Sequence, residues 1–329
     1  MRARRRCGSG VGAASGSVQL RGRCGSGVGA DAPAGALSTL LRMHGQRELS
    51  WRWRVIAALV IAFVRLLRWR IDVQGLEHVP RRGGAVLAFN HHSYLDFVMV
   101  GWPVVRTLRR RLRFLAKREI WSSRKVGWLV RWAGAIPVDR ASAAARSQAF
   151  EAAVGALTEG DLVAVAPEQT ISRSLELLPL RTGAVRMAQQ AGVPVVPVAG
   201  WGTHRALTKG APKRLPGKLP VTVRFGTPME VVPDADAAAA TAELATRLEG
   251  LLHQVQESYP DGTPPGARWV PARLGGAAPT HDEVLRDHQR REQDWSTSPG
   301  EGSGATPTEP RERGGSGSRE RGGSGSTSR

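Results

Sequence analysis

The segment AFNHHSYLDF, residues 88–97, places an acid five positions after a histidine, as His91 and Asp96. Two residues at this offset do not share one face of a helix. They meet if His91 lies on the loop that leaves a strand and Asp96 lies in the first turn of the next helix. Asp96 would then fix the imidazole tautomer and stabilise its charged form, while His91 takes a proton from a hydroxyl group.

A second interpretation of the same segment is purely structural. Ser93 and Asp96 have the spacing of a capping box, in which the acid only satisfies backbone N–H groups at a helix start. In that case the neighbouring His92 is simply a loop or spacer histidine. The histidine–acid spacing alone does not decide between these two interpretations.

Three further blocks follow in order along the chain: GAIPVDR at 134–140, APEQTISRS at 166–174 and VPVVPV at 193–198. Together with NHHSYLD they resemble the four blocks of the glycerolipid acyltransferase family, of the type that forms phosphatidic acid from lysophosphatidic acid. The resemblance covers about residues 50–255. It implies that His91 and Asp96 are catalytic, and it implies four substrate-binding residues: Arg140, Glu168, Thr170 and Arg173.

The third block departs from the family pattern at two positions. Gln169 stands where the family usually has glycine, and Ile171 stands where it usually has arginine. We therefore expect Arg173 to grip the phosphate in place of the missing arginine. The structural alternative for Glu168 is an ion pair that positions Arg140 or Arg173, and for the two arginines it is a solvated surface.

The elements around these blocks alternate between strands and helices. Short apolar runs predict strands at 85–89, 113–116, 135–138, 162–166, 193–198 and 221–225, and helical patterns cover 141–157, 182–190 and 235–254, with a further helix opening at 93–100. This alternation predicts an α/β fold, a sheet with helices on its faces. The resemblance to glycerolipid acyltransferases implies that this central sheet is mixed. Pro194 and Pro197 predict that the 193–198 strand lies at an edge or is irregular.

Residues 43–75 are expected to form an N-terminal membrane-interface helix. The run 51–70 has a short apolar centre, flanked by tryptophan and arginine at both ends. It is too short to span a bilayer, and its flanks favour an interfacial anchor over a buried core helix.

Residues 76–275 are predicted to be the acyltransferase domain, between low-complexity tails at 1–42 and 276–329 that are expected to be disordered. Met43 is hypothesised to be the true start. Both cysteines, Cys7 and Cys24, lie in the first tail, which excludes a disulfide scaffold and a cysteine nucleophile in the core. The spacing of His, Cys and acidic residues predicts no metal site.

The formal charge of +19 lies mainly in residues 43–275 and includes a basic stretch at 106–125. An anionic partner is expected, and a membrane surface suits it better than nucleic acid, for which no motif is present.

The resemblance implies an O-acyltransferase of phospholipid synthesis that needs no cofactor. Its co-substrate would be acyl-CoA or acyl carrier protein, its acceptor 1-acylglycerol-3-phosphate, and its location the cytoplasmic face of the plasma membrane. Two alternatives remain. One is an acyltransferase for another lysolipid or a glycolipid. The other is a non-catalytic basic module that binds membrane or nucleic acid.

Overall fold

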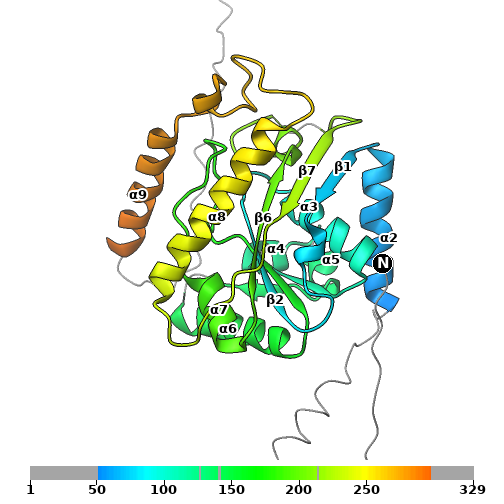
Figure 1. Ribbon diagram of the computed structural model, residues 1–329, viewed down its shortest axis with the longest axis vertical. Coiled ribbons are helices and arrows are strands. Elements are labelled where there is room, and N and C mark those ends of the chain that lie inside the picture. The colour runs from blue at the N-terminus through cyan, green and yellow to red at the C-terminus, as the bar shows by residue number, and fades with distance from the viewer. Residues whose placement is uncertain (1–50, 126, 140–141, 213–214, 298–329) are drawn as a thin grey trace, which may run out of the picture. The chain divides into compact units, whose positions relative to one another are not determined.

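The computed structural model describes residues 51–297, apart from residues 126, 140, 141, 213 and 214. Within this part of the chain, strands form a sheet in the order β1-β7-β6-β2-β5-β3-β4 (Figure 1). Neighbouring strands are parallel except β6 and β7, which are antiparallel, so the predicted mixed sheet is confirmed. The strands are β1 (Arg70–Gln74), β2 (Ala85–Phe89), β3 (Leu112–Lys117), β4 (Ile136–Val138), β5 (Leu162–Val165), β6 (Val195–Trp201) and β7 (Pro220–Phe225).

Helices cover both faces of the sheet (Figure 1). The α-helices are α2 (Trp51–Leu66), α3 (Asp96–Pro103), α4 (Arg118–Trp121), α5 (Gly127–Trp132), α6 (Ala143–Thr158), α7 (Gly183–Ala191), α8 (Ala237–Glu257) and α9 (His281–Thr297). Single turns occur at η1 (Leu76–His78), η2 (Val104–Leu108), η3 (Thr203–Arg205) and η4 (Ala272–Leu274).

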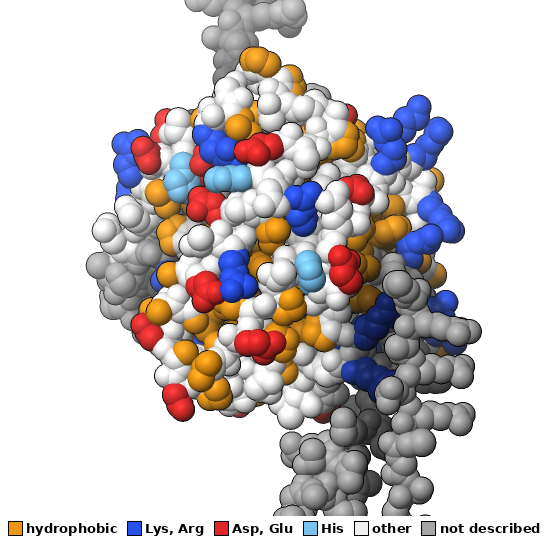
Figure 2. Space-filling model, in the orientation of Figure 1, with side chains coloured by type: hydrophobic (Ala, Val, Ile, Leu, Met, Phe, Trp, Pro, Cys, Tyr) orange, Lys and Arg blue, Asp and Glu red, His pale blue; other side chains and the backbone are white. Residues whose placement is uncertain are grey.

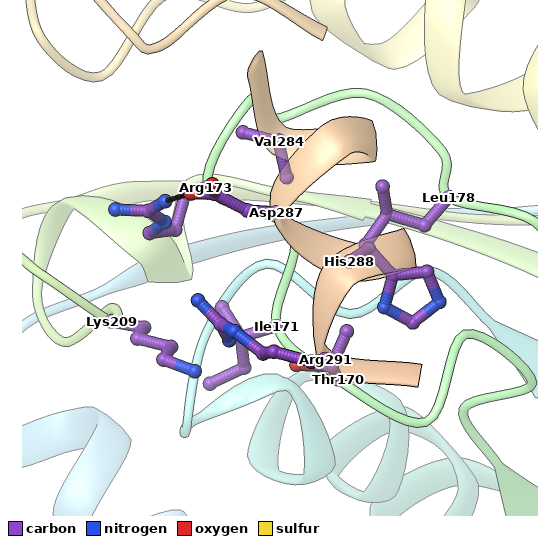
Figure 3. A pocket seen from close by; sticks show the side chains of 9 residues that line it. All are labelled: Thr170, Ile171, Arg173, Leu178, Lys209, Val284, Asp287, His288 and Arg291. Carbon is purple, nitrogen blue, oxygen red and sulfur yellow. Dashed lines mark hydrogen bonds and ion pairs between the residues drawn. The ribbon is translucent and has the colours of Figure 1, made fainter. Parts of the chain in front are cut away.

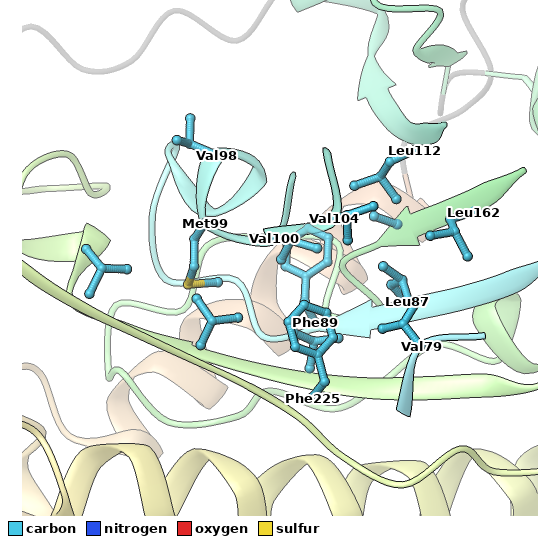
Figure 4. Close-up of a cluster of buried hydrophobic side chains, with 14 of the residues drawn as sticks. Val79, Leu87, Phe89, Val98, Met99, Val100, Val104, Leu112, Leu162 and Phe225 are labelled. Carbon is cyan, nitrogen blue, oxygen red and sulfur yellow. The ribbon is translucent and has the colours of Figure 1, made fainter. Parts of the chain in front are cut away.

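The strand β2 shows why both faces need a cover. Its sequence AVLAF is apolar throughout and all five residues are buried. Successive side chains point to opposite sides of a strand. Leu87 and Phe89 therefore join the core beneath α2 and α3, whereas Val86 and Ala88 join the core beneath α6 and α7. Figure 4 shows the first of these cores, with Met99 and Val100 of α3 near Phe89.

The strand β6 does not take the edge position that was one of its two predicted alternatives. It lies inside the sheet, between β7 and β2, rather than at an edge. Pro194 lies just before the strand. Pro197 lies within it and is tolerated because it faces Gly226, the residue that follows the end of β7. The pairing of β6 with β7 begins only at Val198, opposite Phe225. The side of Pro197 that lacks an N–H faces this point, and its carbonyl accepts the N–H of Gly226 at 2.8 Å. A missing donor there removes no bond between the two strands.

The N-terminal helix is shorter than predicted and is not separate from the domain. The helix α2 ends at Leu66, and Arg70–Gln74 forms the edge strand β1 of the central sheet. One face of α2 packs on the core through Val60, Phe63 and Val64. The alternative of a core helix is therefore correct for this face, whereas the opposite face is exposed, and the membrane-interface interpretation stays a prediction. Residues 43–50 lie outside the described residues.

The C-terminal tail was predicted to be disordered from residue 276, and this is wrong for residues 276–297. The helix α9 begins with a capping box that our sequence reading missed. The N–H of Thr280 donates to Oε2 of Glu283 at 3.0 Å, and the N–H of Glu283 donates to the Thr280 hydroxyl at 3.4 Å. Ala278 and Val284 are buried, which anchors the segment. Residues 1–42 and 298–329 lie outside the described residues.

Much of the basic stretch at 106–125 is engaged within the fold. Arg110 is buried and donates to the carbonyls of Pro80, Gly83 and Gly160. Arg113 forms an ion pair with Asp161, with 2.7 Å between its Nε and Oδ2. These arginines tie the ends of β3 and β5 to neighbouring loops, so they are not part of an anion-binding surface.

Candidate active site

The predicted pair, His91 and Asp96, meets in the predicted way. His91 lies on the loop after β2, and Asp96 is the first residue of α3. The imidazole Nδ1 and the Asp96 Oδ2 are 3.0 Å apart. An ionised carboxylate can only accept hydrogen bonds, so Nδ1 carries the proton and Nε2 is left as the basic nitrogen. The His91 side chain is 26% exposed, which leaves the imidazole within reach of a substrate.

Asp96 is almost fully buried and is held by four donors. Besides His91, its Oδ2 accepts the N–H groups of His92 and Ser93, each at 2.8 Å, and its Oδ1 accepts the hydroxyl of Thr203 at 2.6 Å. Burial opposes ionisation, but the hydrogen bonds and charge of His91 and the Thr203 hydroxyl hold the pKa of Asp96 below its usual value. The carboxylate therefore stays charged beside the imidazole.

The structural alternative for Asp96 is also correct in part. Its bond to the N–H of Ser93 is half of a capping box, and the Ser93 hydroxyl accepts the N–H of Leu95 at 3.0 Å. One carboxylate thus holds the turn before α3 and orients His91. The two interpretations do not exclude each other, because different donors share the same oxygen.

Thr203 is a site residue that the sequence analysis missed. It follows Gly202, whose φ of 108° is a conformation that favours glycine. A Cβ at Gly202 would lie 2.4 Å from the carbonyl oxygen of Pro220, so glycine is required on steric grounds as well. This turn after β6 aims the Thr203 hydroxyl at Asp96.

Asn90 joins the catalytic loop to the next strand. Its side chain accepts the N–H of Gly200 at 2.7 Å and donates to the Gly200 carbonyl at 3.0 Å. The same amide group donates to Nδ1 of His92 at 3.1 Å. Because Asn90 precedes His91, these bonds fix the carboxyl end of β2 against β6 and hold the loop in place.

Glu168 is buried beside His91 and is held by two backbone N–H groups. Its Oε1 accepts the N–H of His91 at 2.6 Å, and its Oε2 accepts the N–H of Leu178 at 3.0 Å. Burial raises the pKa of this carboxyl to about 8, against the effect of the two N–H groups. Glu168 therefore positions the His91 backbone, and its predicted contact with substrate stays a prediction. Of the two arginines considered as ion-pair partners for Glu168, Arg173 pairs instead with Asp287, and Arg140 lies outside the described residues.

The third block forms the loop after β5. Gln169 has a φ of 57°, the left-handed conformation that the family's usual glycine adopts without strain. Arg173 donates from Nη2 to Oδ2 of Asp287 on α9 at 2.7 Å. Thr170 and Arg173 line the same small cavity, whereas Arg140 lies outside the described residues. The structure thus brings Thr170 and Arg173 together near His91.

Two buried histidines flank the pair from the side of β6. Burial lowers the pKa of His92 to about 3 and that of His204 to about 4. Their rings lie 6.4 Å apart, centre to centre, and both pack on Trp201. Both are neutral at pH 7, so His92 is part of the packed core rather than a second base.

These two histidines predict that the protein is acid-labile. Between the ordinary pKa of 6.5 and the lowered values, the unfolded chain binds protons that the folded protein does not. The free energy of unfolding should fall by about 1.4 kcal/mol per pH unit for each histidine below pH 6. Urea unfolding at several pH values measures this slope. The slope should decrease in His204→Gln, and an unchanged slope would contradict the prediction.

Among the described residues, no cluster of three or more His, Cys, Asp or Glu side chains could hold a metal ion. Across the same part of the chain, no helix is both long and apolar enough to cross a membrane.

The similarity to known proteins includes the part of the chain that contains the four blocks. The sequence model of the Acyltransferase family matches residues 70–201, which include His91, Asp96 and the third block. The chain is 35% identical over 161 residues to a 1-acyl-sn-glycerol-3-phosphate acyltransferase of Limnanthes douglasii, covering 48% of this chain and 54% of that protein. The chain thus spans about half the length of this curated relative.

Two other known proteins are similar to this chain over a larger part of their own length. A 1-acyl-sn-glycerol-3-phosphate acyltransferase of Bacillus subtilis is 29% identical over 58% of this chain and 89% of its own length. The crystal structure of the 1-acyl-sn-glycerophosphate acyltransferase PlsC from Thermotoga maritima shares the fold, with a TM-score of 0.53 at 20% identity. It covers 68% of this chain and 89% of that one. The resemblance inferred from the four blocks is confirmed.

Proposed function

We propose that this chain, whose residues 70–201 match the model of the Acyltransferase family, transfers an acyl chain to the free hydroxyl of 1-acylglycerol-3-phosphate and forms phosphatidic acid. The observation that carries the proposal is the 3.0 Å contact between His91 Nδ1 and the buried Asp96 carboxylate. The names of the curated relatives support the choice of acceptor.

The proposed reaction needs one base and no covalent enzyme intermediate. Nε2 of His91 takes the proton of the acceptor hydroxyl as its oxygen attacks the thioester carbonyl. Asp96 stabilises the imidazolium that forms. The tetrahedral intermediate then collapses, the C–S bond breaks, and the thiolate leaves with the proton that His91 returns. The donor is a thioester of CoA or of acyl carrier protein, and the reaction requires no further cofactor.

The test is acylation by the full chain. The protein is incubated with lysophosphatidic acid and a mixture of acyl-CoA and acyl carrier protein donors, and products are identified by mass spectrometry. Phosphatidic acid supports the proposal and reveals the donor. Acylation of another lysolipid or a glycolipid instead would overturn the acceptor, with Ile171 as the first place to look. Binding to lipid or DNA without any turnover would favour the non-catalytic module.

A membrane surface is proposed to supply the lipid substrate. On α2, the apolar residues Trp51, Val55, Leu59 and Leu66 are all exposed and recur at helical spacing. This apolar α2 face continues through Trp132 and the half-exposed Trp128 of α5, because Trp51 stacks edge-on against Trp132. An exposed face of this kind is typical of a helix lying in a membrane interface.

Exposed arginines border this apolar face and suit an anionic bilayer. They are Arg54, Arg65, Arg68 and Arg70. Figure 2 shows Lys and Arg side chains along the side of the molecule where α2 and β1 lie. The combination favours peripheral attachment to an anionic leaflet, which we propose is the cytoplasmic face of the plasma membrane.

The apolar α2 face predicts a specific binding defect. Leu59→Asp should weaken partitioning to vesicles of phosphatidylglycerol and phosphatidylcholine about tenfold or more, because burying a leucine side chain contributes about 1.5–3 kcal/mol. Val232→Asp is the matched control, since Val232 is also exposed but lies between β7 and α8. Vesicle co-sedimentation measures both variants. Equal binding by both would show that α2 does not contact the bilayer.

A further inference from the structure

A small cavity lies between the third block and α9 (Figure 3). Its volume is about 20 Å³, enough for about one water molecule. Thr170, Ile171 and Arg173 line it from the loop after β5, and Lys209 lines it from the segment after η3. From α9, Asp287 and Arg291 complete the lining.

Both loops that line the cavity are bonded to the catalytic segment. The N–H of Ser172 donates to the His91 carbonyl at 2.9 Å, and the hydroxyl of Thr208 donates to the His92 carbonyl at 2.6 Å. These two bonds hold the lining loops against the segment that carries His91.

The cavity is basic. Arg173, Lys209 and Arg291 contribute three positive charges to its lining, against the single carboxylate of Asp287. Figure 3 shows Arg291 reaching from α9 across Ile171, on the side where Lys209 lies. Ile171 itself is apolar and only 7% exposed, so its side chain offers an anion nothing.

Asp287 already occupies the position of an anion. Its Oδ2 is 2.7 Å from Nη2 of Arg173, in an ion pair of ordinary length. A carboxylate and a phosphate monoester accept hydrogen bonds from arginine in similar geometry. Because the cavity holds only about one water molecule, a phosphate would enter by taking the place of Asp287 on Arg173.

We infer that Arg291 of α9 binds the phosphate monoester of the acceptor and supplies, from a different element, the charge that Ile171 lacks. This inference rests on the proposed function, because it assigns the cavity to the acceptor. It makes α9 part of the active site, although the helix lies outside residues 70–201 that match the family.

Binding of glycerol 3-phosphate tests the inference without turnover. Arg291→Ala in the full chain should weaken its binding about ten- to a hundredfold, as expected for a lost hydrogen bond between charged groups. Arg286→Ala is the matched control, because Arg286 lies on α9 but outside the cavity lining. Titration calorimetry measures both. Equal affinity in wild type and Arg291→Ala, or no binding by wild type, would overturn the inference.

Steady-state kinetics separates the two sources of phosphate, acceptor and CoA. Arg291→Ala should raise the KM for lysophosphatidic acid about tenfold or more and leave the KM for the acyl donor within about twofold. A raised KM for the donor alone would assign the cavity to CoA and overturn the inference. If wild type acylates no lysophosphatidic acid, the proposed function fails, whereas the calorimetric result still decides whether Arg291 binds a phosphate monoester.

Discussion

Replacing His91 with alanine is expected to lower kcat about 10²–10⁴-fold, the usual contribution of a general base. The fold should survive, because the side chain is partly exposed and Asp96 keeps its bonds to the N–H groups of His92 and Ser93 and to the Thr203 hydroxyl. The loop also keeps its bond from the His91 N–H to Glu168, since that bond uses the backbone.

The measurement is phosphatidic acid formation by wild type and His91→Ala at saturating substrate, with circular dichroism and thermal unfolding as checks on folding. His253→Ala is the control, because His253 lies on α8, which covers a face of the sheet, and not on the loop after β2 that carries His91. Full activity in a folded His91→Ala would remove His91 from the reaction.

The second large effect is expected from Asp96→Asn. An amide is close in shape to the carboxylate, and its NH₂ group can face Thr203, whose hydroxyl can accept as well as donate. The charge that stabilises the imidazolium of His91 is lost, so kcat should fall about 10²–10⁴-fold. Stability should also fall, because hydrogen bonds to a charged group contribute about 1.5–3 kcal/mol each.

Comparison with Thr203→Val separates these two effects. The valine removes one bond to Asp96 but leaves its charge and its contact with His91, so stability should fall while kcat changes much less. Urea unfolding and kcat are measured for both variants. If Asp96→Asn loses stability but retains kcat, Asp96 serves only to hold the turn before α3.

The histidine–acid pair could be predicted because it depends on local structure alone. Asp96 lies only five positions after His91, and the apolar run at 85–89 before them already indicates a strand. A strand end followed by a helix start brings the two together whatever the rest of the chain does. The same holds for the alternation of strands and helices, which predicted an α/β sheet with helices on its faces.

The supporting contacts could not be predicted, because their partners are distant in sequence. Asn90 bonds to Gly200, and Asp96 to Thr203, each across more than a hundred residues. Register between strands decides these contacts, and the composition of the strands carries no signal for it. The position of β6 inside the sheet could not be predicted for the same reason, because it depends on how β6 pairs with β7.

The helix α9 was missed for a different reason. Its many charged residues resemble the composition of a tail, yet the Thr280–Glu283 capping box was visible in the sequence. At this segment the capping box predicts the start of a helix correctly, whereas the average composition does not.

The strand order has a consequence for how the protein is made. The strand β2, which carries the catalytic loop, lies between β6 and β5, both of which are synthesised later. Thr203 follows β6, so Asp96 gains its fourth donor only after more than a hundred further residues have been added. A ribosome-bound fragment that ends before Trp201 thus has the His91–Asp96 sequence but not the site. We expect acyl transfer to appear late during translation, as a marker that the sheet has closed around β2.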